Sequence, residues 1–317
     1  MRYLTFQNGD KMPIIGLGTW KSAPGEVYKA IRTAIEVGYR HFDCAHLYGN
    51  EPEIGMALAD ALSVKEVKRE DLWITSKLWN NRHRIEQVEP AIQLTLKNLQ
   101  LEYLDLYLIH WPIVLKDTIN FPTKGDEMES LKITPLNETW SGMIGVKEKG
   151  LAKHIGTSNF SIKKIKGLIS ASGIKPENNQ VEIHPFLQQN ELRAYCSSQG
   201  ITLTGYAPLG SADRPANRIL EGEPNLFENK TLQDLANNKG LSVAQIMLAW
   251  AVNNGTCAIP KSVNNDRLTE NLGTADIVLS SNEMEEISSI NKNYRYIKGD
   301  FWCLPGTAYT IENLWDE

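Results

Sequence analysis

The sequence predicts an α/β fold, a (β/α)8 TIM barrel, and three observations lead to that prediction. Eight short apolar segments recur along the 317 residues, separated by longer amphipathic stretches. The connections between them are short, and parallel strands need crossover helices that cover both faces of the sheet. Barrels of this kind take about 250 residues, so about 70 residues remain for insertions and a tail. We therefore expect residues 1–317 to form a single barrel domain.

The predicted elements begin with an N-terminal β-hairpin, because alternating residues flank the turn signal "NGD". Apolar runs predict the eight barrel strands at Ile14–Trp20, Arg40–Ala45, Leu72–Leu78, Tyr103–Pro112, Ala152–Phe160, Asn179–Pro185, Ile201–Gly210 and Thr256–Ser262. Apolar residues at helical spacing predict helices at Gly25–Val37, Ile85–Leu99, Leu136–Lys149, Ile162–Ser170, Asn190–Gln199, Leu232–Lys239, Asn264–Leu272 and Asn282–Ile290.

Three segments are longer than a barrel needs, namely Ile113–Pro135, Ser211–Asn229 and the tail Asn291–Glu317. Long loops in a compact domain are usually functional or disordered, and the aromatic residues in these segments argue against disorder. We expect them to lie on the C-terminal face of the barrel, with the tail as a specificity loop.

The composition and charge exclude several classes of partner. The net charge is −5, so no basic field attracts nucleic acid or an anionic membrane. No apolar run is long enough to span a bilayer, and the first residues lack the apolar core of a signal peptide. The four cysteines lie far apart without a CxxC motif, which favours free thiols in a reducing compartment. We expect a cytoplasmic protein, and the acidic surface favours a monomer.

Charged and polar side chains collect where the predicted strands end, and that rim is where barrels of this kind carry their active sites. Asp43 ends the second strand and Tyr48 follows it, while Lys77 and His110 end the third and fourth strands. Each residue also has an ordinary structural explanation, as a helix cap, a turn aromatic, a solvated strand end or a packed imidazole. Their occurrence together on neighbouring strands favours a proton-transfer site.

The chemistry that joins these four residue types is proton donation. A free phenol has a pKa of about 10 and donates slowly at neutral pH, and a neighbouring ammonium lowers that pKa. A buried lysine keeps its charge only beside an opposite charge, so we expect Asp43 to hold Lys77 and Lys77 to polarise Tyr48. A neutral His110 can orient the oxygen that receives the proton. The set suits carbonyl reduction and lacks the groups needed for acyl transfer, glycoside hydrolysis or metal binding.

Carbonyl reduction needs a hydride, which no side chain supplies, so a nicotinamide cofactor is implied. The motif "GLGTWK" fails as a dinucleotide fingerprint, because a lysine stands where the third glycine belongs. The segment Ile259–Asn271 is a better candidate, because Lys261, Arg267 and a helix capped by Asn264 or Asn265 can meet a phosphate. The alternative for this segment is a solvated basic loop.

Four further residues at the strand ends have side chains that suit a nicotinamide. Tyr206 can stack a flat ring, and Ser158, Asn159 and Gln180 are the hydroxyl and amide types that hold a carboxamide. The alternative for Tyr206 is ordinary core packing.

Motifs that occur in order along nearly the whole chain identify a resemblance. They are "MPIIGLGTW", "GYRHFDCAHLYGNE", "ITSKLW", "LDLYLIHWP", "IGTSNF", "NQVEIHP", "YAPLGS" and "IPKS" followed by Arg267 and "EN". The sequence resembles the aldo-keto reductase family, in particular its aldehyde and aldose reductases. The resemblance implies a barrel that binds NADPH across its C-terminal face. It implies Tyr48 as general acid and His110 as the orienting residue, with Asp43 and Lys77 as the tuning pair.

The resemblance also implies the residues that contact the cofactor and the substrate. The implied cofactor contacts are Thr19, Trp20, Asp43, Ser158, Asn159, Gln180, Tyr206, Leu209, Ser211, Lys261, Ser262, Asn264, Arg267, Glu270 and Asn271. The implied substrate pocket is lined by Trp20, Tyr48, Trp79, His110, Trp111, Phe121 and Trp302. Relatives often have threonine where Asn264 stands, whereas Lys261 and Arg267 favour NADPH, with NADH as the weaker alternative.

The function expected from this resemblance is NADPH-dependent reduction of aldehydes to primary alcohols, of the alcohol dehydrogenase (NADP+) type. Aromatic and aliphatic aldehydes suit the aromatic pocket, and open-chain aldoses are further candidates. Two alternatives stay open: a family member dedicated to one sugar or ketone, such as a xylose or ketosteroid reductase, and a non-catalytic barrel that senses nucleotides. The expected partner is therefore a small molecule.

Overall fold

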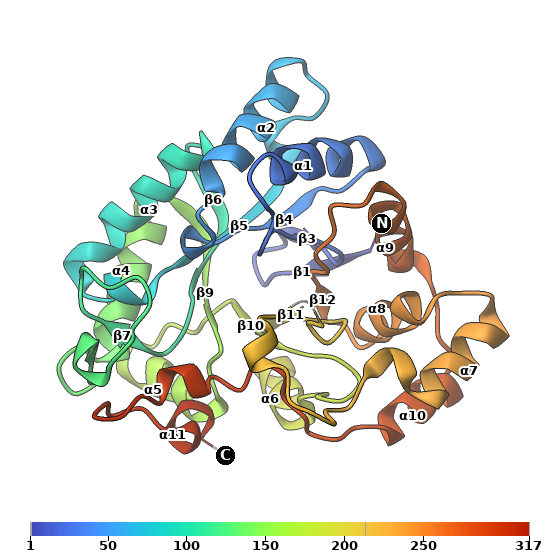
Figure 1. The fold of residues 1–317 in the computed structure, drawn as a ribbon. Helices are drawn as coiled ribbons and strands as arrows, with labels where there is room; N and C mark the ends of the chain where they lie inside the picture. Colours follow the sequence, from blue (N-terminus) through green and yellow to red (C-terminus); the bar gives the residue numbers. More distant parts are fainter. Residues whose placement is uncertain (1, 213, 317) are drawn as a thin grey trace.

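The computed structural model describes residues 2–212 and 214–316, and its centre is a parallel sheet that curls into a barrel inside a layer of helices (Figure 1). The order of the strands along the sheet follows the order of the chain. The strands are β3 (Leu17–Gly18), β4 (His41–Asp43), β5 (Trp73–Leu78), β6 (Leu104–Ile109), β9 (Ala152–Ser158), β10 (Asn178–Glu182), β11 (Thr202–Tyr206) and β12 (Cys257–Ala258). Each lies within, or within one residue of, a predicted run, so the predicted (β/α)8 fold is confirmed.

Backbone hydrogen bonds between the first and last strands close the barrel. Gly16 N donates to Ala258 O over 2.9 Å, and Gly18 N donates to Pro260 O over 3.1 Å. A Cβ atom on Gly18 would lie 2.8 Å from the carbonyl oxygen of Ile259. Glycine is therefore required where the two strands meet, because any side chain would push them apart.

Helices are present at all the predicted places, and the described residues add three that were not predicted. The helices are α1 (Glu26–Val37), α2 (Glu51–Ser63), α3 (Ile85–Leu99), α4 (Leu136–Glu148), α5 (Ile162–Ser172), α6 (Asn190–Gln199), α7 (Lys230–Lys239), α8 (Val243–Asn253), α9 (Asn265–Gly273), α10 (Ser281–Ser289) and α11 (Ile311–Trp315). Sequence analysis omitted α2, α8 and the short α11. Every residue of α8 from Ile246 to Val252 is buried, so this helix lacks the amphipathic contrast by which the others were found.

The N-terminal hairpin closes one end of the barrel and leaves the other end for the site. Strands β1 (Tyr3–Thr5) and β2 (Lys11–Pro13) pair antiparallel, as predicted. The ring of Phe6 in their turn lies 5.1 Å from the ring of Trp73, the first residue of β5. The hairpin therefore covers the N-terminal ends of the strands.

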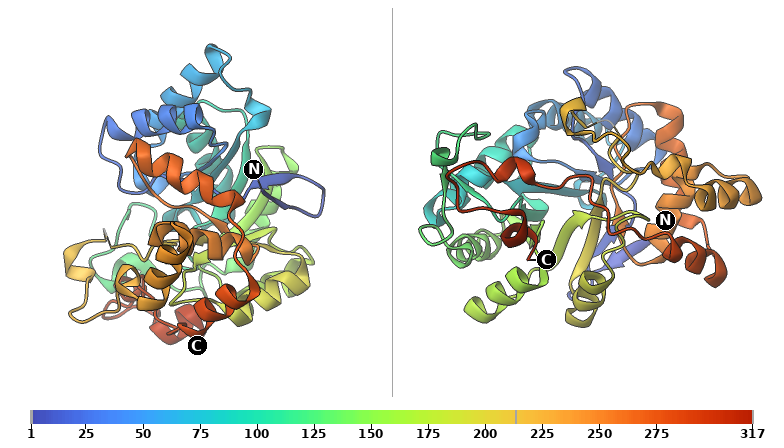
Figure 2. Two further views of the ribbon diagram at one scale, coloured as in Figure 1. Left: turned by 90° about the vertical axis from the view of Figure 1, so that its right-hand side faces the viewer. Right: turned by 60° about the horizontal axis from the view of Figure 1, so that its bottom comes forward.

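Two of the long segments contact each other, and the described part of the tail crosses the molecule from α10 to α11 (Figure 2). The segment Ile113–Pro135 contains a short antiparallel pair, β7 (Val114–Leu115) with β8 (Met128–Glu129). The hydroxyl of Tyr309 in the tail donates to Glu129 O over 2.7 Å and accepts from Val114 N. The two segments are thus joined directly to each other.

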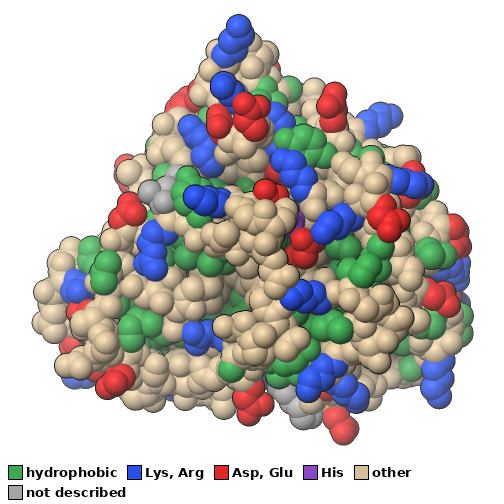
Figure 3. Space-filling model, turned by 180° about the vertical axis from the view of Figure 1, so that it is seen from behind, with side chains coloured by type: hydrophobic (Ala, Val, Ile, Leu, Met, Phe, Trp, Pro, Cys, Tyr) green, Lys and Arg blue, Asp and Glu red, His purple; other side chains and the backbone are tan. Residues whose placement is uncertain are grey.

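Side chains of both signs are interspersed over the face seen from behind (Figure 3). Within the described residues, no helix is both long and apolar enough to cross a membrane. In the same part of the chain, no group of three or more His, Cys, Asp or Glu side chains is arranged to hold a metal ion.

Candidate active site

A cavity of about 480 Å³ opens at the C-terminal ends of the barrel strands, and its size is typical of sites for small molecules. Strand-end polar residues form one part of its wall, and aromatic residues from the long segments form another. The predicted residues that line it are Thr19, Trp20, Asp43, Tyr48, Trp79, His110, Trp111, Phe121, Ser158, Asn159, Gln180, Tyr206, Leu209, Ser211, Lys261, Ser262, Asn264, Arg267 and Trp302.

A buried ion pair lies at the base of this cavity. Lys77, at 1% exposure, places its Nζ 2.5 Å from Asp43 Oδ1 and 2.9 Å from the carbonyl oxygen of Cys44. The amide of Gln180 donates to the other carboxylate oxygen of Asp43 over 2.7 Å. These partners offset the cost of burying both charges, and they hold the Lys77 ammonium in one place. The predicted pairing of Asp43 with Lys77 is present, although Lys77 does not itself line the cavity.

A short turn brings Tyr48 back over the ion pair. Residues His46–Tyr48 form one 3₁₀ turn after β4, and Gly49 ends it in the left-handed region with φ of 70°. The Lys77 ammonium then lies 5.2 Å from the centroid of the Tyr48 ring. Tyr48, the predicted general acid, therefore lies beside Lys77, as the sequence suggested.

The pKa of Tyr48 differs from the expectation. Burial raises the pKa of this phenol above its ordinary value, and the positive charge of Lys77 opposes that rise without cancelling it. The expected lowering was wrong because it considered the ammonium and left out desolvation. The phenol is consequently protonated at neutral pH and available as a donor, while Lys77 favours the phenolate that remains after proton transfer.

His110 faces the tyrosine and is neutral. Its ring lies 5.9 Å from the Tyr48 ring in an edge-on arrangement and 5.1 Å from the ring of Trp79. Burial, together with the charge of Lys77, holds the pKa of His110 well below its ordinary value. Its Nδ1 atom is buried and has no hydrogen-bond partner among the described residues. A neutral imidazole at this place can donate a hydrogen bond to an oxygen without competing for the proton.

The amide and hydroxyl residues predicted for a carboxamide form one connected network. Asn159, in the left-handed region with φ of 64°, donates from Nδ2 to His110 O over 3.0 Å. Its Oδ1 accepts from the hydroxyl of Tyr206 over 2.7 Å, and Ser158 Oγ donates to Gln180 O over 2.8 Å. The network links this side of the cavity to the strand that carries the histidine.

The predicted phosphate site lies at the N-terminus of α9. Asn264 caps this helix by accepting from Arg267 N over 3.0 Å, which decides between the two predicted caps. Asn264 lines the cavity together with Lys261, Ser262 and Arg267, so two cations and the N-terminal end of the helix lie at the same space.

Two predicted adenine contacts lie away from the cavity wall. Glu270 accepts a short hydrogen bond from Ser242, and Asn271 is 5% exposed. Neither residue lines the cavity. Their role as cofactor contacts stays a prediction.

The apolar wall contains the predicted aromatic residues and several that sequence analysis missed. The Trp302 ring lies 5.9 Å from Trp79, 5.8 Å from Trp111 and 5.2 Å from Phe121. Leu47, Ala207, Pro208, Ala212, Arg218, Phe227, Val263, Ile297 and Phe301 also line the cavity. Phe301 was detectable as the neighbour of Trp302 in the aromatic tail. The guanidinium of Arg218 lies over the ring of Phe301, 4.2 Å from its centroid, in a cation–π contact. No local sequence pattern indicates this contact.

A parallel barrel with a buried Asp–Lys pair, a tyrosine and a neutral histidine at its C-terminal mouth defines a class of carbonyl-reducing oxidoreductase. The sequence profile of the Aldo/keto reductase family matches residues 14–292. An aldo/keto reductase of Synechocystis sp. is 50% identical over 317 residues, which are 100% of this chain and 97% of that protein. Aldo-keto reductase family 1 member A1 of Rattus norvegicus is 47% identical over 91% of this chain and 89% of its own.

A solved structure agrees with these matches. The aldose reductase of Schistosoma japonicum superimposes with a TM-score of 0.87 and is 40% identical, covering 98% of this chain and 100% of its own. The protein therefore belongs to the aldo-keto reductase family, and the predicted resemblance is confirmed. Membership makes it an oxidoreductase that reduces carbonyl groups with a nicotinamide cofactor of the NAD(P)H type.

Proposed function

We propose that this protein reduces aldehydes to primary alcohols with NADPH, using Tyr48 as the general acid. The observation that carries the proposal is the arrangement at the cavity base. There the buried Asp43–Lys77 pair lies beneath Tyr48, with the neutral ring of His110 opposite.

The proton leaves from Tyr48. Its raised pKa keeps the hydroxyl protonated until a stronger base forms, and the alkoxide produced from a carbonyl oxygen is such a base. The Lys77 ammonium stabilises the phenolate that remains, and Asp43 keeps this ammonium charged and in place. His110 donates a hydrogen bond to the same oxygen as negative charge develops on it.

The donor groups of the cavity fit a phosphorylated dinucleotide. The N-terminus of α9, Lys261 and Arg267 meet the requirements of a phosphate, and the cluster of Ser158 and Asn159 offers donors and acceptors for an amide. The bound cofactor would supply the hydride. Lys261 and Arg267 beside the N-terminus of α9 support a preference for NADPH over NADH, because only NADPH carries the negatively charged 2′-phosphate.

The wall opposite the polar groups supports aldehydes with apolar bodies. Trp20, Trp79, Trp111, Phe121 and Trp302 present ring surfaces to the cavity. Aromatic and aliphatic aldehydes gain from burying apolar area against these rings, by about 25 cal/mol for each Å². Open-chain aldoses belong in the same test, since one structural relative is an aldose reductase.

The test is a set of paired assays with the purified protein. NADPH oxidation is followed with benzaldehyde, propanal, xylose and a ketosteroid, and each assay is repeated with NADH. The proposal expects the highest kcat/KM for an aldehyde and at least a tenfold preference for NADPH. A protein that binds NADPH tightly but oxidises it with none of these carbonyls would be a nucleotide-binding barrel. A protein that turns over xylose or the ketosteroid far better than either aldehyde would contradict the proposed substrate class.

A further inference from the structure

Three residues of the aromatic wall, Trp79, Trp111 and Trp302, belong to a hydrophobic cluster that is separate from the barrel core. The buried members of this cluster are Trp79, Trp111, Ile113, Leu115, Met128, Trp302, Tyr309, Leu314 and Trp315. Four of these, from Trp302 onward, belong to the tail, which contributes no strand to the barrel. The position of the wall therefore depends on how the tail is attached.

The tail ends on the N-terminus of α5 through a compact set of polar contacts. One carboxylate oxygen of Asp316 accepts from Ser161 Oγ over 2.6 Å and from Lys164 Nζ over 2.5 Å. Its other oxygen lies 3.1 Å from Lys163 Nζ. Lys164 Nζ also donates to the carbonyl oxygens of Asn313 and Leu314, over 2.7 Å and 2.9 Å.

This attachment differs from an ordinary surface ion pair in its burial and its geometry. The side chains of Lys164 and Asp316 are each only 10% exposed. Ser161 is the N-cap of α5, so the Asp316 carboxylate lies where a helix terminus favours an anion. Lys164 in turn meets the last carbonyl oxygens of α11, where a cation is favoured. The pair thus joins the ends of two helices, and Figure 1 shows α11 beside α5.

Tightly packed residues connect this attachment to the aromatic wall of the cavity. The ring of Trp315, next to Asp316, lies 5.8 Å from the ring of Trp111, and its Nε1 donates to Lys298 O over 2.7 Å. Gly299 follows with φ of 77°, and a Cβ atom there would lie 2.5 Å from Leu314. The turn that carries Trp302 starts at Gly299, so a displacement of α11 would displace this turn as well.

The attachment point on α5 is also tied to the polar side of the site. Asn179 donates to Phe160 O over 2.9 Å, and Asn159 donates to His110 O. The segment from Ser158 to Ser161 therefore holds the cofactor-facing residues at one end and the tail at the other.

We propose that Lys164 and Asp316 form a latch that positions the Trp111–Trp302 wall and so determines the preference for aromatic over small aldehydes. Both are positioning residues, since neither lines the cavity. The proposal rests on the proposed aldehyde reductase function and adds the residues that set its selectivity.

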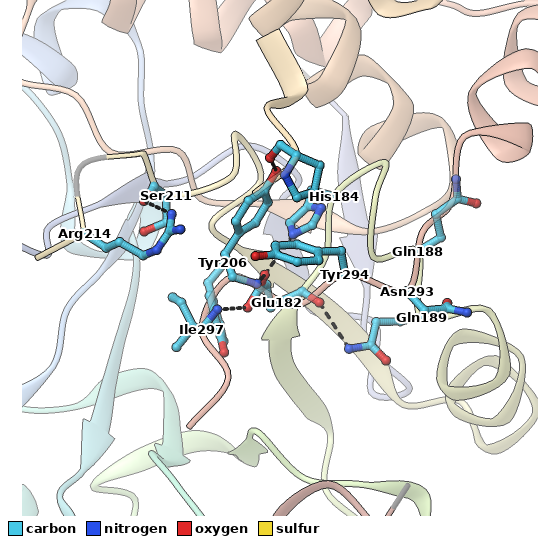
Figure 4. A network of polar contacts seen from close by, with 12 residues as sticks. Glu182, His184, Gln188, Gln189, Tyr206, Ser211, Arg214, Asn293, Tyr294 and Ile297 are labelled. Carbon is cyan, nitrogen blue, oxygen red and sulfur yellow. Dashed lines mark hydrogen bonds and ion pairs between the residues drawn. The ribbon is translucent and has the colours of Figure 1, made fainter. Parts of the chain in front are cut away.

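Other contacts hold the rest of the tail when the latch is broken. The buried carboxylate of Glu182 accepts from Ile297 N over 2.9 Å (Figure 4). It also accepts from Tyr296 N over 2.7 Å. His184 contacts the same carboxylate, and Tyr309 joins the tail to the β7–β8 pair. Variants of the latch should therefore fold, with the loosening confined to the end of the tail.

The test compares two aldehydes across a set of variants. In Lys164→Met, kcat/KM for benzaldehyde should fall about 10-fold to 100-fold, mainly through KM, because displaced walls lose their fit to the ring. The value for propanal should stay within about threefold, since a small aldehyde uses little of the wall. Asp316→Asn should behave in the same way, and the double variant should be no worse than Lys164→Met alone. Lys164→Arg keeps the positive charge and should retain most of the wild-type kcat/KM for benzaldehyde.

Lys166→Met is the matched control. Lys166 lies on the same helix, is exposed, and has no ion pair among the described residues. Its replacement should leave kcat/KM unchanged for both benzaldehyde and propanal. Equal losses for both aldehydes, additive effects in the double variant, or unchanged benzaldehyde kinetics in Lys164→Met would each overturn the proposal.

A second readout separates this proposal from the proposed aldehyde reductase function. Hydrogen exchange of the amides in Gly299–Asp316 should be faster in Lys164→Met and unchanged in Lys166→Met. A wild-type protein that reduces neither aldehyde defeats the proposed function and the selectivity role together. An active wild-type protein whose tail and selectivity are unaffected by Lys164→Met defeats the latch alone.

Discussion

Replacement of Lys77 by methionine tests both the stability and the chemistry of the site. The substitution keeps the length and apolar stem of the side chain and removes only its charge. Lys77 is 1% exposed and contributes the only cation in contact with Asp43 among the described residues. Gln180 then remains as the neutral donor to this carboxylate.

The cost follows from the carboxylate left behind. Removing one partner of a buried ion pair costs about 3–5 kcal/mol of folding free energy, because the other charge stays buried without compensation. The rate should fall as well. Tyr48 loses the charge that stabilises its phenolate, and general acid catalysis is typically worth about 10²- to 10⁴-fold in kcat.

Two assays decide the outcome for Lys77→Met. Urea unfolding of the variant should show the loss of stability, and steady-state kinetics with benzaldehyde should show the loss of kcat. Combining Lys77→Met with Asp43→Asn removes both charges and should recover a large part of the stability but none of the rate. A Lys77→Met protein with wild-type stability and a kcat within a few-fold of wild type would refute the reasoning.

Further predictions concern the cofactor and the buried histidines. Arg267→Ala should weaken NADPH binding about tenfold or more and leave NADH binding within about twofold, as measured by fluorescence titration. The pKa of His41 is lowered to about 4 and that of His83 to about 3 by burial. Since the unfolded chain binds these protons first, stability should be constant above about pH 6.5 and fall as the pH decreases towards 4, seen as a falling melting temperature. Because His110 stays neutral, His110→Asn should lower kcat without altering how kcat/KM depends on pH between about 6 and 8.

Strand ends were the part of the fold and site that local sequence revealed best. A short apolar run that stops at a charged or aromatic residue predicts both the strand and the direction in which its last side chain lies. Asp43 ends β4, Lys77 is the last residue but one of β5 and His110 directly follows β6, so the barrel brings all three to the same end.

Burial and long-range contacts were beyond local patterns. The helix α8 was missed because its residues are buried on all sides. The predicted direction of the Tyr48 pKa shift was wrong because desolvation depends on surrounding segments that are distant in sequence. The contact of Lys164 with Asp316 joins residues 152 positions apart, and no spacing rule connects such a pair.

The measurement that tests the central claim most directly is the activity of Tyr48→Phe. This variant keeps the ring and removes only the hydroxyl, so its cavity and packing against His110 are preserved. We predict that kcat for benzaldehyde falls by about 10²-fold or more, while NADPH binds within about twofold of wild type. Aldehyde reduction at the wild-type rate by Tyr48→Phe would show that the proton comes from another group, and the mechanism proposed for this site would be wrong.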